Sequence, residues 1–448
     1  MGEDFLHYLS DQLLKSAEIN RDLYQQFSVK RGLRNEDGSG VLVGLTKISS
    51  VIGFKIVDEE VVPTDGELYY RGINIKDIVE GIQKSGRHGF PEVTYLLLFG
   101  KLPTQQELDE FEAYLRPLIN LPPGLNETSI LQFPSPSVMN KLQRVILVLY
   151  GTDPNPDDTS IPNVIRQCLS LIAKFPIIIA YSYQAMRHKL YGDSLFVHPP
   201  NPNICCAENF LYMLREDRQY SKLEADMLDL ALILHAEHGG GNNSTFTTHV
   251  VTSSQTDTYS AISAAVGSLK GPLHGAANSS VMDMMTNIKE NVKDWKDEEE
   301  VAAYIEKILK GQAHDGKGLV YGMGHAVYTK SDPRAVILKE KAKDLAVDKG
   351  RSDEYHLYLN VEKLTPQVFQ RVKKSDKVIS PNVDFYSGFV YDMLGFPREI
   401  YTPLFAMARV VGWSAHRIEE LINGKRIIRP AYKNVLPKQK YIPIEKRK

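Results

Sequence analysis

The sequence predicts a mainly α-helical protein with two or more lobes and a few short strands near its start. Its 448 residues exceed the length at which a single hydrophobic core usually stops growing. Apolar residues recur at helical spacing through most of the chain after residue 74, whereas glycines and β-branched residues gather before it. The content of 43% hydrophobic and 24% charged residues is typical of a globular protein.

The first part of the chain carries one helical pattern followed by strand-like segments. Residues 3–27 have apolar side chains at mostly helical spacing, which predicts an opening amphipathic helix. Segments 41–45, 51–57 and 67–71 are rich in glycine and β-branched residues. They predict short strands.

Helical patterns occupy almost all of the remaining chain. One helix is predicted over residues 78–99. Thr104 and Ser221 each have a glutamate three positions later, so each is expected to begin a helix with a capping box. Three proline-rich segments are expected to be surface connections: 117–136, 154–162 and 199–202.

Charge and cysteine content argue against several kinds of partner. The net charge is −2 and the isoelectric point is about 6.7, which gives no support for a nucleic-acid or anionic-membrane partner. Three cysteines, two of them adjacent, form neither a disulfide framework nor a zinc-ligand spacing, so we expect a reducing compartment. The start of the chain lacks a secretory-signal pattern, and the longest apolar runs are too short to span a bilayer.

His274 lies at a Gly-Pro break between two apolar helical patterns. A histidine beside the unpaired N–H groups of a following helix meets a positive potential that disfavours imidazolium. A neutral imidazole can donate a hydrogen bond to a carbonyl oxygen that becomes an enolate. A purely structural histidine near a turn is the alternative.

Further polar residues are predicted at or near helix starts. Asp332 is a candidate N-cap followed by Pro333, which places Arg334 in a first helical turn. Asp384 is expected in another first turn, where the helix dipole favours a carboxylate that can act as a general base. Arg409 interrupts an apolar face and therefore needs an anionic partner if it is buried, either a structural carboxylate or a substrate.

Near-matches to three other site patterns fail. Residues 311–318 have P-loop spacing but lack its Ser/Thr and follow a helix, and residues 322–327 lack the third glycine of a dinucleotide fingerprint. His235 and His238 could share a metal ion, but the sequence offers no third ligand. We therefore expect no metal site.

Four segments carry distinct residue patterns: Gly271-Pro272-Leu273-His274-Gly275, Gly322-Met323-Gly324-His325-Ala326-Val327-Tyr328, Asp332-Pro333-Arg334 and Asn382-Val383-Asp384-Phe385-Tyr386-Ser387-Gly388. In this order along the chain, they resemble the successive signatures of the citrate synthase family. Residues 235–242 resemble the family's oxaloacetate-site helix end, and residues 66–73 resemble its early strand motif. Together the matching segments span roughly residues 45–430.

The resemblance implies a citrate synthase-like, two-domain helical fold. A large domain would contain residues 1–277 and 388–448, and a small helical domain, 278–387, would be inserted into it. Closure of one domain on the other would assemble the site and exclude water. The resemblance also implies a homodimer.

The implied reaction condenses acetyl-CoA with oxaloacetate and hydrolyses the citryl thioester. By resemblance, Asp384 removes a methyl proton, and His274 hydrogen-bonds the thioester oxygen as it becomes an enolate. His325 would polarise the ketone of oxaloacetate and protonate the alkoxide. No metal and no permanently bound cofactor is implied, and acetyl-CoA is a co-substrate.

The implied substrate contacts include arginines, which suit the two carboxylates of oxaloacetate. Arg429 would come from the other subunit, although this chain has Ala431 where many relatives have a further arginine. Gly239 also stands where many relatives have glutamate. The implied oxaloacetate-binding residues are His238, Arg334, Arg409 and Arg429, and coenzyme A would lie along 319–324 at Leu319, Gly322 and Gly324.

Two alternatives remain open. A 2-methylcitrate synthase would use propionyl-CoA, and one methylene changes discrimination by only about 1–3 kcal/mol. A catalytically silent helical scaffold dimer would have lost the catalytic trio or the arginines. We expect a cytoplasmic enzyme, with a matrix enzyme that has lost its transit peptide as the other possibility.

Overall fold

The computed structural model describes residues 2–36, 38–57, 60–275, 277–375 and 377–447, which divide into two units, Met1–Leu45 and Thr46–Lys448. The first unit contains α1 (Gly2–Ala17) and α2 (Asp22–Gln26). The predicted opening helix is confirmed, but it ends at Ala17 and a second helix follows. At the start of that second helix, the Asn20 side chain accepts a hydrogen bond from the Asp22 N–H at 3.0 Å. The predicted strand over 41–45 is wrong, since that segment is irregular.

The second unit begins with a three-stranded antiparallel sheet in the order β1-β2-β3. Its strands are β1 (Ser49–Val57), β2 (Glu60–Tyr70) and β3 (Ile73–Asn74). Ser49 lies opposite Tyr70, and the register shifts between Ile52 and Phe54. The predicted strands over 51–57 and 67–71 are confirmed, although β2 begins earlier than the sequence pattern indicated.

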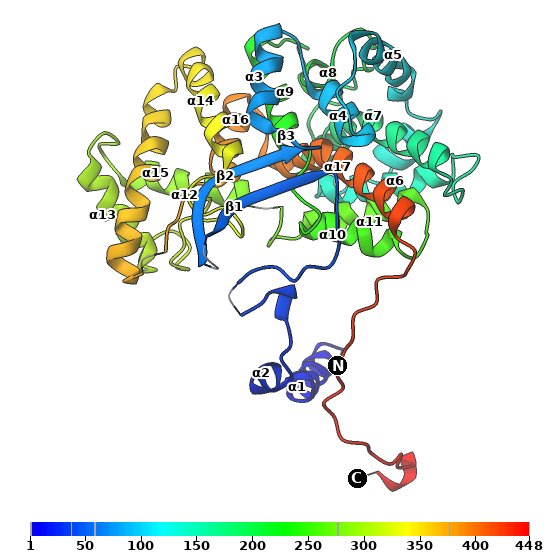
Figure 1. The fold of residues 1–448 in the computed structure, drawn as a ribbon, viewed down its shortest axis with the longest axis vertical. Coiled ribbons are helices and arrows are strands. Elements are labelled where there is room, and N and C mark those ends of the chain that lie inside the picture. The colour runs from blue at the N-terminus through cyan, green and yellow to red at the C-terminus, as the bar shows by residue number, and fades with distance from the viewer. Residues whose placement is uncertain (1, 37, 58–59, 276, 376, 448) are drawn as a thin grey trace. The chain divides into compact units, whose positions relative to one another are not determined.

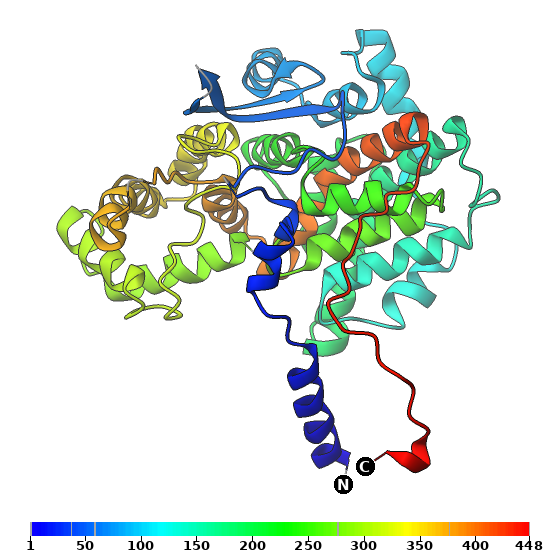
Figure 2. The ribbon, with the colours of Figure 1, turned by 60° about the horizontal axis from the view of Figure 1, so that its bottom comes forward.

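Helices make up most of the second unit, so the predicted mainly α fold is confirmed. Figures 1 and 2 show α12–α16 gathered on one side, and α5–α8 with α11 on the other. The first group of helices comprises α3 (Ile75–Ser85), α4 (Phe90–Phe99), α5 (Gln105–Leu115), α6 (Val138–Tyr150), α7 (Ile161–Met186), α8 (Cys206–Leu214), α9 (Lys222–His235), α10 (Asn243–Thr252), α11 (Thr258–Lys270) and α17 (Tyr401–Asn423). The second comprises α12 (Ala277–Asn291), α13 (Glu298–Leu309), α14 (Pro333–Asp348), α15 (Ser352–Lys373) and α16 (Val383–Met393).

Side-chain caps set several helix starts. Thr104 and Ser221 form the capping boxes that the sequence predicted, with reciprocal bonds to a glutamate at the third position. Asp332 and Asn382 each accept a hydrogen bond from a first-turn N–H, of α14 and α16 respectively. The helix predicted over 78–99 is instead two helices, because the chain turns at Gly86 and α4 begins afresh with a proline in its first turn.

The segment Ile161–Tyr191, α7 with the turn that follows it, is long and apolar enough to cross a membrane by length and composition. The separate apolar runs of the sequence did not predict this. However, 83% of its most apolar window is buried inside the protein, as expected of a core helix. Its length is therefore weak evidence for a membrane segment.

The β1–β2 hairpin packs against the segment that leads into α14. A Cβ on Gly53 would lie 2.3 Å from the Val327 carbonyl oxygen, and a Cβ on Gly66 would lie 2.1 Å from that of Ser331. Thr329 donates its hydroxyl proton to the Gly53 carbonyl at 2.9 Å. These close backbone contacts hold in place the loop that carries His325.

Candidate active site

The end of α9 is anchored by a buried tyrosine. The Tyr70 hydroxyl lies 3.0 Å from the Ile233 carbonyl and 3.1 Å from the Glu237 carbonyl, and it accepts the Glu237 N–H at 3.3 Å. His235, Glu237 and His238 follow one another on this segment and are buried. The sheet thus fixes the turn on which His238 stands.

Arg409 lies on α17 and is fully buried. Its Nε–H donates to the His235 carbonyl at 2.8 Å, and its guanidinium carbon lies 4.7 Å from the centre of the Phe405 ring. Within the part of the chain that the structure describes, neither Nη1 nor Nη2 has a hydrogen-bond partner. Burial lowers the pKa of Arg409 to about 10, which leaves it charged at neutral pH. The group has unused donors suited to an anion.

Arg334 is buried too, but it already has a carboxylate partner. Its Nε and Nη2 donate to Asp332 at 3.1 and 2.7 Å. Asp332 also accepts the Val383 N–H at 3.2 Å, which ties the start of α14 to the start of α16. The structure therefore places Arg334 at the site with part of its donor capacity used.

The ring of His325 has a defined proton position. Its Nδ1 accepts the N–H groups of Val327 and Tyr328, both at 3.0 Å. Because this nitrogen faces two donors, it carries no proton, and the neutral ring bears its proton on Nε2. The ring stacks on Tyr328 with centroids 4.6 Å apart and meets His238 edge-on at 5.2 Å.

His238 and His235 are neutral. Burial, and then the charge of Arg334, hold the pKa of each well below its ordinary value. Among the described residues, none bonds to His238 Nε2 or to either ring nitrogen of His235. Sequence reasoning singled out His238 as a substrate contact but gave His235 no such role.

His274 lies in the turn between α11 and α12, and its N–H donates to the Gly271 carbonyl at 2.9 Å. Its Nε2 lies 3.0 Å from the Ser244 hydroxyl, which also accepts the Trp413 Nε1–H at 3.1 Å. Burial, and then the charge of Arg409, lower the pKa of His274 to about 4. The predicted neutral imidazole is supported, but its causes are burial and Arg409.

Asp384 is the second residue of α16, as predicted for a first turn. Burial raises the pKa of Asp384 from 3.8 to about 6, with Asp332 adding to the rise and Arg334 and Arg409 opposing it. A carboxylate with a pKa near 6 is ionised at neutral pH and is a stronger base than a solvent-exposed one.

The predicted coenzyme A segment is tied to the start of α16. The Gly324 N–H donates to the Ser380 carbonyl at 2.7 Å, while the Asn382 N–H and side chain donate to the Gly322 and Gly324 carbonyls, both at 2.9 Å. Leu319 is half exposed.

Among the described residues, no hydrogen bond joins Arg429 to another predicted site residue. Arg429 is exposed on the irregular segment after α17. His238, His274 and Asp384 share one electrostatic environment, since Arg409 affects the pKa of each.

Sequence reasoning missed three neighbours of the site. Glu237 is fully buried, and its Oε1 accepts the Gly239 N–H at 2.5 Å. Ser244 contacts the ring of His274, and Trp413 donates its Nε1–H to Ser244. The one available signal was proximity in sequence, because Glu237 lies inside the segment that contains His235 and His238.

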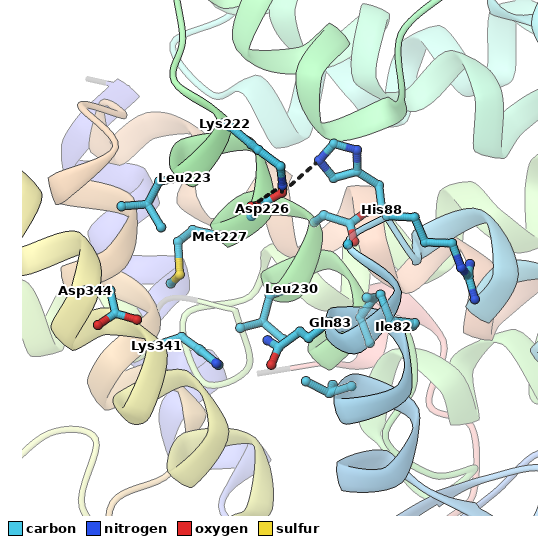
Figure 3. A pocket seen from close by; sticks show the side chains of 15 residues that line it. Ile82, Gln83, His88, Lys222, Leu223, Asp226, Met227, Leu230, Lys341 and Asp344 are labelled. Carbon is cyan, nitrogen blue, oxygen red and sulfur yellow. Dashed lines mark hydrogen bonds and ion pairs between the residues drawn. The ribbon is translucent and has the colours of Figure 1, made fainter.

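A cavity of about 240 Å³ lies between α3, α9 and α14 (Figure 3). Of the described residues that line it, none is a predicted site residue. Close to it, the ligand atoms of His88, Cys205 and Glu208 lie within 4.8 Å of one another. Cys205 and Glu208 form a capping box at the start of α8, and His88 pairs with Asp226, so helix capping and an ion pair account for this cluster.

Comparison with known proteins identifies relatives of the chain. A family model described as "Citrate synthase, C-terminal domain" matches residues 37–431. A citrate synthase of Synechocystis is 37% identical over 395 residues, 88% of each chain. The 2-methylcitrate synthase 1 of Corynebacterium glutamicum is 34% identical over 428 residues, 94% of this chain and 98% of the relative.

A solved structure extends the similarity to the fold. It is the ternary complex of citrate synthase from Thermoplasma acidophilum with carboxymethyl coenzyme A and oxaloacetate, with a TM-score of 0.75 and 29% identity over 94% of this chain and 99% of that one. Fold and relatives together define a mainly α-helical enzyme that transfers acyl groups. The chain belongs to the citrate synthase family.

Proposed function

We propose that this enzyme is a citrate synthase, which condenses acetyl-CoA with oxaloacetate and releases citrate and coenzyme A. Two unpartnered η-nitrogens on the buried Arg409, among the described residues, are the observation that supports this most directly. They match one carboxylate of a small dicarboxylic acid in a bidentate fork. His238 Nε2, also buried and without a partner among the described residues, supplies a further polar contact.

In this proposal the proton steps use neutral imidazoles and one carboxylate. The Asp384 carboxylate takes a proton from the methyl carbon of the acyl thioester, and the enolate carbon attacks the ketone of oxaloacetate. His325, whose proton lies on Nε2, donates to the ketone oxygen and protonates the alkoxide. Water then cleaves the citryl thioester and releases the coenzyme A thiol.

The proposed role of His274 requires the hydroxyl proton of its neighbour Ser244 to point in one direction. The Ser244 hydroxyl has one proton and accepts the Trp413 Nε1–H. When that proton points to His274 Nε2, the ring carries its own proton on Nδ1 and can donate to the thioester oxygen. Asn242 Oδ1, 2.9 Å from Ser244, competes for the same proton, so the amide of Asn242 must turn to donate instead.

Domain division and assembly belong to the same proposal. Residues 278–387 would form the small domain, the chain would be a homodimer, Arg429 would complete the partner's site, and coenzyme A would lie along 319–324. Supporting the division, His238 lies just after α9 and Arg409 lies on α17, whereas Arg334 and Asp384 lie on α14 and α16, in the other group of helices (Figure 1).

The identity of the acyl group is the open part of the function, since relatives include both citrate and 2-methylcitrate synthases. Release of free thiol from acetyl-CoA and from propionyl-CoA, each with oxaloacetate, decides it through the ratio of kcat/KM. We expect acetyl-CoA to be preferred. A higher kcat/KM for propionyl-CoA would identify a 2-methylcitrate synthase, and no thiol release from either would overturn the proposal.

A further inference from the structure

Four side chains behind the end of α9 form a continuous hydrogen-bonded chain. Glu237 Oε1 lies 3.0 Å from His416 Nε2, and His416 Nδ1 lies 3.0 Å from His249 Nε2. His249 Nδ1 lies 2.8 Å from Glu420 Oε2. The side chains of Glu237 and His416 are 0% exposed, whereas those of His249 and Glu420 are 15% and 16% exposed. This Glu237–Glu420 chain links the candidate site to solvent.

Forming all three contacts of the Glu237–Glu420 chain requires one more proton than two neutral imidazoles supply. Each of its three contacts needs one proton between two acceptor atoms. Two neutral imidazoles provide two protons, and two ionised carboxylates provide none. The third contact therefore needs an additional proton, shared among the four groups. With it the four groups carry one net negative charge, and without it they carry two and lose one contact.

Glu237 connects this proton to the site. Its Oε1 also accepts the Ser49 hydroxyl at 2.9 Å and the Gly239 N–H at 2.5 Å, so it stabilises the turn that carries His238. Burial lowers the pKa of Arg409, and the charge of Glu237 opposes that fall. An added negative charge behind Arg409 weakens its attraction for an anionic substrate.

Other charged groups also face the Glu237–Glu420 chain. Glu419 on α17 has a carboxylate oxygen 3.9 Å from His416 Nδ1, and Arg71, at the end of the sheet hairpin, feels the charges of Glu419 and Glu237. Burial and then His416 lower the pKa of His249, while Glu420 and Glu419 oppose the fall. A test of the additional proton therefore spans the ordinary pKa of an imidazole, about 6.5.

We propose that His416, His249 and Glu420 are positioning residues that bind one proton and orient Glu237, and that losing this proton weakens the binding of oxaloacetate. This rests on the proposed function for the identity of the dicarboxylate. The residues act through Glu237 and touch neither substrate.

Glu420→Gln tests the proton count directly. A glutamine can donate its amide N–H to His249 Nδ1, so all three contacts form with two neutral imidazoles and no additional proton. The variant thus mimics the protonated wild-type chain. Calorimetric titration with oxaloacetate alone should give equal dissociation constants near pH 5.5, and about 3–10-fold tighter binding by the variant near pH 8. Asp384 titrates in both proteins, so its effect on affinity cancels in the ratio of the two dissociation constants.

Glu419→Gln is the matched control, because it removes the same charge one residue away and leaves the three contacts in place. It should keep a dependence of oxaloacetate affinity on pH, displaced to lower pH because the charge of Glu419 favours the additional proton. If the ratio of the wild-type dissociation constant to that of Glu420→Gln stays constant with pH, the proposal is overturned. Loss of the pH dependence in Glu419→Gln would overturn it as well, since charge alone would then explain the effect.

Failure of the proposed function can be distinguished from failure of this inference. If neither protein binds oxaloacetate, the proposed function is wrong, and thermal unfolding of the ligand-free proteins then tests the Glu237–Glu420 chain. Folded wild type takes up a proton that Glu420→Gln does not need, so the wild-type Tm should rise relative to that of the variant as the pH falls from about 8 to about 5.5. A difference in Tm that does not change with pH contradicts the additional proton.

Discussion

Two buried arginines in different states define the candidate site at the scale of single residues. Arg334 forms a two-bond pair with Asp332, whereas Arg409 has one backbone acceptor and two unpartnered η-nitrogens among the described residues. A buried charge without a full set of partners is unfavourable, and an incoming carboxylate relieves this cost. In the proposed function, Arg409 therefore contributes binding energy that the ligand-free protein does not use.

Arg409→Gln should raise the KM for oxaloacetate by about 10–100-fold, as expected from losing charged hydrogen bonds worth about 1.5–3 kcal/mol. Steady-state kinetics with oxaloacetate varied measures the effect. Arg417→Gln is the matched control, because Arg417 is buried on the same helix and fully engaged by Thr258, Thr252 and the Thr256 carbonyl. It should lower Tm and leave that KM nearly unchanged. An unaltered KM in Arg409→Gln would remove Arg409 from the oxaloacetate site.

Asp384→Asn should lower kcat by about 10²–10⁴-fold, because an amide cannot accept the substrate proton. The same change should stabilise the protein at neutral pH. The pKa of Asp384 is raised from 3.8 to about 6, so its contribution to stability is present below pH 3.8 and is lost as the pH rises through 6. We expect the free energy of unfolding near pH 7 to increase by about 1–2 kcal/mol in urea titrations. Turnover at the wild-type rate would exclude Asp384 as the base.

The wild-type enzyme should show an acid limb set by Asp384. Since the base must be ionised and its pKa is about 6, kcat/KM for the acyl-CoA should level off above pH 7 and fall tenfold per pH unit below 6. Initial rates at low acyl-CoA and saturating oxaloacetate measure this limb. An inflection near pH 4 instead would show that burial does not raise the pKa of this carboxyl.

At the scale of elements, sequence reasoning succeeded where the determinant is local. Capping residues act within three or four positions, so the starts of the helices after Thr104, Ser221 and Asp332 could be predicted. It failed where the partner is distant, because periodicity carries no information about pairing. Glu237 and His416 are 179 positions apart, and nothing in the sequence links them. The pairing of Arg334 with Asp332 was missed for another reason, since an N-cap aspartate gives no sign that it also neutralises a neighbour.

The contact between α17 and the end of α9 depends on a glycine. A Cβ on Gly412 would lie 2.2 Å from Glu237 Oε2 and 2.6 Å from the Ala236 carbonyl oxygen. The Gly412 N–H also donates to that carbonyl at 3.2 Å. The absence of a side chain lets α17 bring Arg409 and His416 against α9.

Gly412→Ala should destabilise the protein by about 2–4 kcal/mol and raise the KM for oxaloacetate, because α17 must move away from α9. Gly81→Ala is the control, since Gly81 also lies inside a helix but a methyl group there would have no described atom within 4 Å outside its own helix backbone and chain neighbours. It should be neutral, or stabilising by up to about 1 kcal/mol. Urea unfolding and the kinetic assay compare the two variants. Equal effects of the two substitutions would show that the close contact between α17 and α9 does not depend on Gly412.

At the scale of the whole molecule, the proposed site draws on two groups of helices and on a second subunit. His238 follows the end of α9 and Arg409 lies on α17, and α14 and α16 begin with Arg334 and Asp384 in their first turns. A ligand that contacts both groups would favour their closure. Arg429 is exposed in the single chain, which fits a residue that acts in the site of a partner.

Mixing two inactive variants tests the crossed contribution of Arg429. In a heterodimer of Arg429→Ala and Asp384→Asn, one site would contain both substitutions, while the other would contain neither if Arg429 acts across the interface. Random reassociation of equal amounts should therefore restore about a quarter of the wild-type sites. If Arg429 acts within its own chain, every site keeps one defect and the mixture stays inactive. Thiol release after denaturation and joint refolding, compared with each variant refolded alone, distinguishes these outcomes.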